Sequence, residues 1–134
     1  MKQNKTRLMS IAAIVAGMLT LQAFVADDNT MTKEDGAYVV NTTQLGKDVV
    51  GYMGNTPLKI YIRKDKVEKI EFLKNQETPK YYARVKKALG EAWNGKKVKE
   101  AATLKVDAVT GATLSSEAVK KNVQLGLDYY KAHK

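Results

Sequence analysis

The segment over residues 8–26, LMSIAAIVAGMLTLQAFVA, has no charged side chain and directly follows a basic stretch that contains Lys2, Lys5 and Arg7. A basic flank before an apolar run at the N-terminus is typical of a secretory signal, and the run also approaches the ~20 residues that span a bilayer as a helix. We therefore predict that residues 1–26 are a signal peptide or an N-terminal membrane anchor. Because basic flanks stay in the cytoplasm, both interpretations predict a periplasmic or other extracytoplasmic protein, either secreted or anchored to the inner membrane through residues 8–26.

Residues 27–134 have to fold without cysteine. The chain contains no cysteine and a single histidine, His133, next to its end. This composition excludes disulfides, iron–sulfur ligation, c-type haem attachment and metal sites built from Cys or His clusters. A domain of this size buries roughly two-thirds of its unfolded surface, so a hydrophobic core is sufficient. We predict a flexible tether over 27–36 and one domain over 37–134, with no metal.

The charge of the chain is strongly positive. The formal net charge is +9, and residues 1–26 contribute +3 of it, so residues 27–134 carry +6. A basic surplus can indicate a nucleic-acid or anionic membrane partner. Here acidic residues separate the lysines, and no predicted helix has a purely basic face, which favours a solvated surface. Nucleic acid is therefore not an expected partner.

Two neighbouring runs have the pattern of an antiparallel hairpin. Leu58, Ile60 and Ile62 alternate with polar residues and predict a half-buried strand. After a turn over 63–66, the apolar positions from Val67 to Phe72 predict a second strand, with a bulge where their parity shifts. Shorter strands are predicted over 37–43, 49–54 and 102–106.

Two helices are predicted after the hairpin. Pro79 is expected to begin the first, where its missing N–H costs nothing, and the apolar stripe of this helix extends to Trp93. The second covers 116–134, and its stripe consists of Ala118, Val119, Asn122, Val123, Gly126, Leu127 and Tyr130. The order of elements predicts an α+β fold, a small antiparallel sheet packed with two main helices.

The stretch DAVTGATLSS, residues 107–116, crowds hydroxyl side chains around Gly111 just before the last helix. One interpretation is an ordinary turn in which Thr113 or Ser115 caps the helix. The other is an anion site, because a helix N-terminus preceded by Gly and Ala lets a phosphate approach free N–H groups. An exposed hydroxyl here would also serve as a covalent acceptor if a partner enzyme supplied the base.

Residues 107–113, DAVTGAT, resemble the D-x-x-(S/T)-G-A-T flavinylation motif of FMN-binding domains. Such domains occur as part of the sodium-pumping NADH:quinone reductase, as part of Rnf complexes and in many small exported proteins. In that family a flavin transferase takes FMN from FAD and joins the FMN phosphate by a phosphoester to the last Thr of the motif. The resemblance implies Thr113 as the acceptor. The neighbouring residues implied to contribute to the site are Asp107, Thr110, Gly111, Ala112, Leu114 and Ser115.

Two further stretches lie in the order that the family has. Residues 51–58, GYMGNTPL, resemble the G-Y-x-G-x-[PL] entry into its first long hairpin, and residues 77–79 resemble its E-T-P stretch beside the isoalloxazine ring. The sequence departs from the family at Lys80, where Gly often follows E-T-P, and at Asn75, where His is common. The cofactor-binding residues implied by these stretches are Tyr52, Glu77, Thr78 and Pro79.

Aromatic side chains are candidates to wall the flavin ring, namely Tyr52, Tyr81, Tyr82 and Trp93. The alternative for each is packing in the core, which we favour for Trp93. For Glu77 two roles are open. It would accept hydrogen bonds from the ring N–H or ribityl groups, or it would be an acid that suits the helix dipole.

These observations predict an exported FMN-binding electron-transfer protein, a flavin carrier rather than a stand-alone enzyme. The expected partners are a flavin transferase with FAD as the FMN donor, a membrane redox donor and an extracytoplasmic acceptor. Two alternatives remain open at this point: a noncovalent FMN-binding accessory module, and a flavin-free interaction domain on the same fold. Retention of flavin after denaturation separates covalent from noncovalent binding.

Overall fold

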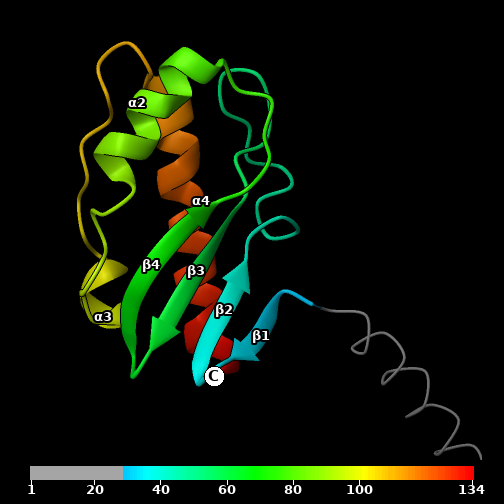
Figure 1. The fold of residues 1–134 in the computed structure, drawn as a ribbon, viewed down its shortest axis with the longest axis vertical. Helices are drawn as coiled ribbons and strands as arrows, with labels where there is room; N and C mark the ends of the chain where they lie inside the picture. Colours follow the sequence, from blue (N-terminus) through cyan, green and yellow to red (C-terminus); the bar gives the residue numbers. More distant parts are fainter. Residues whose placement is uncertain (1–28) are drawn as a thin grey trace, which may run out of the picture.

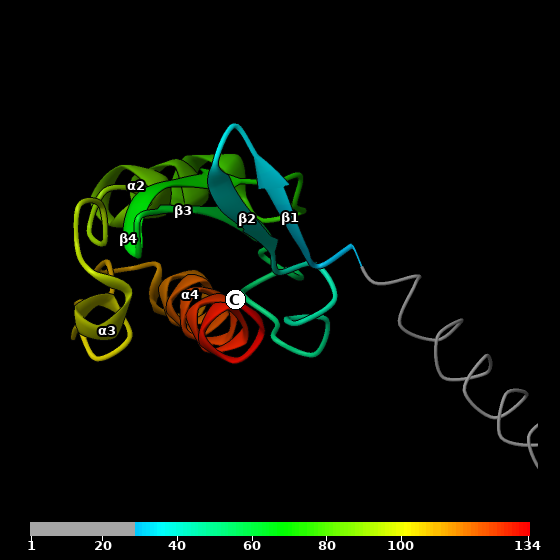
Figure 2. The same ribbon diagram turned by 90° about the horizontal axis from the view of Figure 1, so that it is seen from below.

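The computed structural model describes residues 29–134, which form a four-stranded antiparallel sheet and three helices (Figure 1). The strands follow one another in the sheet in chain order, and the long last helix, α4, lies across one face of the sheet (Figure 2). The predicted α+β fold is confirmed. Residues 1–26 lie outside the described part of the chain. The elements are β1 Met31–Glu34, β2 Ala37–Asn41, β3 Leu58–Arg63, β4 Lys66–Phe72, α2 Pro79–Leu89, α3 Val98–Ala101 and α4 Thr113–His133.

The central hairpin of β3 and β4 forms as the sequence predicts. Leu58 pairs with Phe72 at one end, and the register shifts between Tyr61 and Ile62, which confirms the expected bulge. Lys64 and Asp65 make the turn, with φ values of 52° and 63°. Left-handed residues in a two-residue turn match the twist of the flanking strands, so this turn sets the register of the hairpin.

The expected flexible tether over 27–36 is wrong for Met31–Glu34, because these residues form β1 and pair with β2. Asp35 and Gly36 make the turn, with φ values of 49° and 83°. Asp-Gly is a strong hairpin signal. The polar composition of residues 31–34 concealed the strand. Because β1 lies at the edge of the sheet and only Met31 is partly buried, the strand needs no alternating apolar pattern.

Two other predicted strands are wrong. Residues 49–54 form a loop that has a single bridge, between Val50 and Asn55. Residues 102–106 follow the short helix α3, which no sequence pattern predicted, and they begin with turn hydrogen bonds from Thr103 N and Leu104 N to carbonyls of α3. An alternating segment forms a strand only where its backbone N–H and C=O groups can pair with the free edge of a sheet. Here the N–H groups of Thr103 and Leu104 already bond within the turn.

The helix that begins at Pro79 ends earlier than predicted, at Leu89 instead of Trp93. Gly90 follows, and its N–H still bonds to Lys86 O, after which residues 91–95 form turns. Trp93 is nevertheless only 3% exposed and lies in the core. Glycine is a poor helix former, so the chain leaves the helix there and the turns carry the indole inward.

The predicted buried stripe of α4 is confirmed at every position from Ala118 to Tyr130. It packs on the inner face of the sheet, where Leu58, Ile60 and Ile62 are fully buried. A side-chain carbon at Gly126 would lie 2.5 Å from Ile60 Cδ1, so this glycine allows the helix to approach β3 closely. Within residues 29–134, no helix combines the length and apolar character needed to cross a membrane.

Tyr130 gives the fold a testable dependence on alkaline pH. Its side chain is 3% exposed and donates a 3.0 Å hydrogen bond to Asp65 Oδ1. Burial, followed by the bond to Asp65, raises the pKa of Tyr130 to about 12. The folded state thus favours the neutral phenol, so this stabilisation is complete below pH ~10 and is lost as the pH rises towards ~12. Because the side chain of Asp65 is half exposed and solvent screens its interaction with the phenol, the loss should be about 1 to 2 kcal/mol.

Urea unfolding at a series of pH values between about 9 and 12 measures this loss. Tyr130→Phe lacks the ionising hydroxyl, so its free energy of unfolding should fall less steeply over that range. The burial-based account of Tyr130 would be wrong if the wild type and Tyr130→Phe lost stability in parallel.

Candidate functional site

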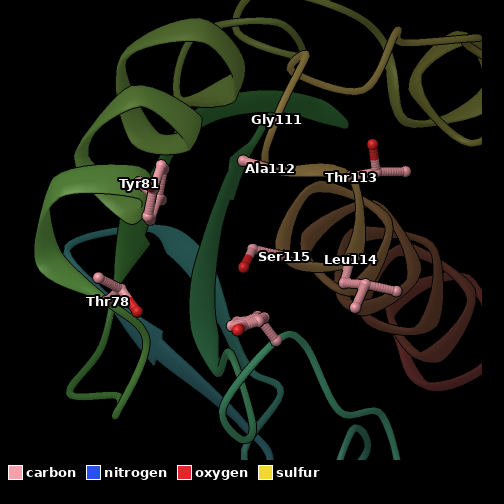
Figure 3. A pocket seen from close by; sticks show the side chains of 8 residues that line it. Thr78, Tyr81, Gly111, Ala112, Thr113, Leu114 and Ser115 are labelled. Carbon is pink, nitrogen blue, oxygen red and sulfur yellow. The ribbon is translucent and has the colours of Figure 1, made fainter.

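A cavity of about 460 Å³ opens between the loop over 51–54, the start of α2 and the start of α4 (Figure 3). Three segments that are far apart in the sequence therefore form its walls. Tyr81 lies in the first turn of α2, and Thr78 is the residue immediately before this helix. The DAVTGAT stretch ends at the opposite wall. The lining residues are Tyr52, Thr78, Tyr81, Gly111, Ala112, Thr113, Leu114 and Ser115.

The N-terminus of α4 is open at this cavity. The helix begins at Thr113, and Ala112 occupies the N-cap position without a side-chain cap. The expected cap by Thr113 or Ser115 is therefore wrong, because both side chains already lie within the helix. N–H groups in the first turn have no intrahelical partner and mark the positive end of the helix dipole. Gly111, with a φ of 82°, makes the turn that leads into this end.

The hydroxyls of the motif have different surroundings. Ser116 is fully buried, and its Oγ accepts a bond from Val109 N at 3.0 Å and donates one to Ala112 O at 2.8 Å. Ser116 thus fixes the turn of the motif onto the first turn of α4. Thr113 is exposed at the cavity, and no hydrogen bond of its hydroxyl occurs within residues 29–134.

Ser116 was not among the predicted site residues. The sequence does contain a signal for it, because Ser116 lies three residues before Val119 and seven before Val123. This spacing places it on the buried stripe of the helix. A serine on such a stripe needs a hydrogen-bond partner, which the carbonyl of Ala112 provides.

Glu77 does not line the cavity, but it is bonded to two residues that do, Tyr52 and Ser115. Its side chain is 5% exposed. Oε1 accepts hydrogen bonds from Tyr52 N at 2.8 Å and from Ser115 Oγ at 2.6 Å. Oε2 accepts from Met53 N and, at 3.2 Å, from Gly54 N. The carboxylate is thus bonded to the protein itself, and it joins the loop over 51–54 to α4.

The four candidate aromatic residues separate into two groups. Tyr52 and Tyr81 are 62% and 45% exposed and line the cavity. Tyr82 and Trp93 are buried in the core, as we favoured for Trp93. Burial, followed by the negative charge of Glu77, raises the pKa of Tyr82 well above its ordinary value, so its phenol stays neutral.

Besides Glu77, three predicted site residues do not line the cavity: Asp107, Thr110 and Pro79. Thr110 is nevertheless tied to the opposite wall, because Arg84 Nη2 of α2 donates a 2.8 Å bond to its carbonyl oxygen. Arg84 was not among the predicted site residues. No local pattern marks it, because the contact joins residues 26 positions apart.

The cavity fits a phosphorylated aromatic ligand such as the expected FMN. Its volume lies within the usual range for small-molecule sites, roughly 300–1,000 Å³. Free N–H groups at the start of α4 suit a phosphate. Tyr52, Tyr81 and the 61% exposed Leu114 offer apolar surface to a flat ring. Within residues 29–134, no cluster of His, Cys or acidic side chains could hold a metal ion.

Comparison with known families gives one match. The model of the FMN-binding domain matches residues 51–128, more than half of the chain, and this range includes all three walls of the cavity. Neither the curated proteins nor the solved structures gave a significant match. The chain belongs to the FMN-binding domain family, and its cofactor is FMN.

Proposed function

We propose that this protein is an exported electron carrier in which FMN is attached through a phosphoester to Thr113 Oγ1. The observation that carries the proposal is the position of this hydroxyl. Thr113 is exposed and lines the cavity as the first residue of α4, at an uncapped helix N-terminus, and its hydroxyl has no hydrogen-bond partner within the described residues. The neighbouring Ser115 and Ser116 are buried and bonded to the protein, which leaves them unsuited as acceptors.

The attachment requires a separate flavin transferase with FAD as the donor. Thr113 Oγ1 forms a bond to the phosphorus on the FMN side of the FAD pyrophosphate, and the P–O bond to the AMP portion breaks. AMP leaves, and a base of the transferase takes the hydroxyl proton. The described residues around Thr113 include no His, Cys or paired acids at the cavity, so the base has to come from the partner.

The flavin supplies one- and two-electron chemistry, and the protein binds and orients it. The first turn of α4 would hold the phosphate, and Tyr52, Tyr81 and Leu114 would cover the ring and exclude water. The expected signal or anchor over 1–26 would bring this carrier outside the cytoplasm, between a membrane donor and an extracytoplasmic acceptor. The chain has the role of a redox component and needs no substrate site of its own.

Intact mass under denaturing conditions, after co-expression with a flavin transferase, tests the attachment. The wild type should gain the mass of FMN less one water, and Thr113→Ala should gain nothing. Thr103→Ala is the matched control, because Thr103 is exposed and outside the cavity, and it should be flavinylated like the wild type. A wild type without added mass that still binds FMN when folded would instead support the noncovalent accessory module.

A further inference from the structure

We propose that Glu77 is the positioning residue that assembles the cavity, because its carboxylate bonds to two of the three walls and its backbone leads directly into the third. The importance of this role for flavin rests on the proposed function. The walls are the loop over 51–54, the start of α2 and the start of α4. Glu77 bonds directly to the first and the third, and it is followed immediately by Thr78, the N-cap residue of α2.

The loop over 51–54 has few other attachments. Within it, Gly51 N bonds to Gly54 O, and beside it Val50 bridges to Asn55. The side chains of Tyr52 and Met53 are 62% and 58% exposed, so packing contributes little to their position. The N–H groups of the remaining three residues all donate to the carboxylate of Glu77. Apart from this turn bond and this bridge, the conformation of the wall therefore depends on the side chain of Glu77.

The carboxylate itself is held only by hydrogen-bond donors. Glu77 is not part of any ion pair within residues 29–134. Its side chain is nevertheless almost fully buried, with 5% of its surface exposed. A buried charge without a counter-ion is costly unless donors satisfy it, and bonds to a charged acceptor are stronger than neutral ones. The loop and Ser115 thus stabilise the carboxylate, and the carboxylate fixes both of them.

The surrounding sequence makes room for Glu77 and fixes its backbone. A side-chain carbon at Gly51 would lie 2.1 Å from Glu77 Oε1, so only glycine at this position allows the carboxylate to approach the loop. Asn75 Oδ1 accepts a 3.0 Å bond from Glu77 N. Asn75 also donates to Leu73 O. The segment after β4 is therefore shaped to present this carboxylate.

Glu77→Gln is the most direct test, because it keeps the size of the side chain and removes its charge and one of its two acceptor oxygens. In the full chain before flavin loading, hydrogen exchange at residues 52–54 should accelerate about tenfold or more. Exchange in the buried part of α4 should change much less. Glu91→Gln, an exposed position outside the cavity, is the control and should exchange like the wild type. Unchanged exchange at 52–54 in Glu77→Gln would overturn the proposal.

Ser115→Ala keeps the test decisive if Glu77→Gln does not fold. It removes only the bond from α4 to Glu77 Oε1. Exchange at 52–54 should still rise, by less than in Glu77→Gln, because the loop and α4 share this carboxylate. Loop exchange equal to that of the wild type in this variant would show that the carboxylate does not couple the two walls, and would overturn the proposal.

The consequence for flavin is measured separately, as FMN affinity in a Thr113→Ala background, where no covalent bond can form. Adding Glu77→Gln should weaken FMN binding about tenfold or more. Leu127→Ala, in the core, is the control for general instability and should leave FMN affinity unchanged while the protein is folded. Equal losses in both variants would overturn the positioning role. If the background variant binds no FMN, noncovalent flavin binding fails by itself, and the exchange experiment still decides the role of Glu77.

Discussion

Asn122→Asp should cost the protein about 3 kcal/mol or more of its free energy of unfolding at neutral pH, although the two side chains are nearly equal in size. Asn122 is 1% exposed in α4. Its Nδ2 donates to Thr56 O and Thr56 Oγ1, both at 3.0 Å, and to Ala118 O at 3.1 Å. A carboxylate there would place negative oxygen against the two carbonyl oxygens of Thr56 and Ala118. These bonds join α4 to the segment that enters β3, so the loss affects the whole core.

The pH dependence of this variant has a definite sign. Burial raises the pKa of the introduced carboxyl above the ordinary value of ~3.9 for aspartic acid. The folded state then favours the protonated form, which can again donate to Thr56 O. The variant should therefore recover stability as the pH falls and lose it as the pH rises through the raised pKa.

Urea unfolding of Asn122→Asp and Asn122→Ala at about pH 7 and about pH 4 separates charge from lost hydrogen bonds. Both variants lose the amide donors of Asn122, but only the first introduces a group that can ionise. Asn122→Asp should be the less stable of the two at the higher pH, and the difference should shrink or reverse at the lower pH. A constant difference at both values would contradict the charge argument.

Leu127→Ala should cost about 2 to 5 kcal/mol, because it leaves a cavity where α4 packs on the sheet. Leu127 is fully buried in the core cluster. Leu114→Ala offers a matched control on the same helix, since Leu114 is 61% exposed and lines the candidate flavin site. Its stability should stay within about 0.5 kcal/mol of the wild type, while FMN binding in the Thr113→Ala background should weaken.

Thermal and urea unfolding of the two leucine variants, with FMN titrations of the same samples, measure both effects. We expect that Leu127→Ala loses stability and keeps its FMN affinity. Leu114→Ala should keep its stability and lose FMN affinity. Equal destabilisation of the two would mean that Leu114 packs into the core, against its exposed position in the structure.

Local periodicity was sufficient for the central part of the fold. The alternation from Leu58 to Phe72 gave the hairpin and its bulge, and the stripe from Ala118 to Tyr130 gave the buried face of α4. These patterns are strong because each element buries one face, and the spacing of that face is a property of the element alone. The start of α2 also followed from a local signal, the proline at position 79.

The wrong secondary-structure predictions concern segments whose structure depends on elements that are neighbours in space. Residues 102–106 alternate like a strand, yet turn bonds to α3 use the first of their N–H groups. Met31–Glu34 look like a tether, yet they form an edge strand because β2 offers a free edge. Composition and alternation do not specify whether a partner edge is available, since that depends on where the rest of the chain has folded.

The sequence by itself determined that the DAVTGAT stretch stands at the start of a helix. It also determined that the chain matches the FMN-binding domain family. Only the tertiary structure decided what each polar side chain does there. It leaves Thr113 exposed at the cavity, and it brings Glu77 to Ser115, 38 residues away. The reason is physical: a helix start follows from short-range spacing and turn chemistry, whereas the partner of a buried carboxylate follows from how separate elements pack.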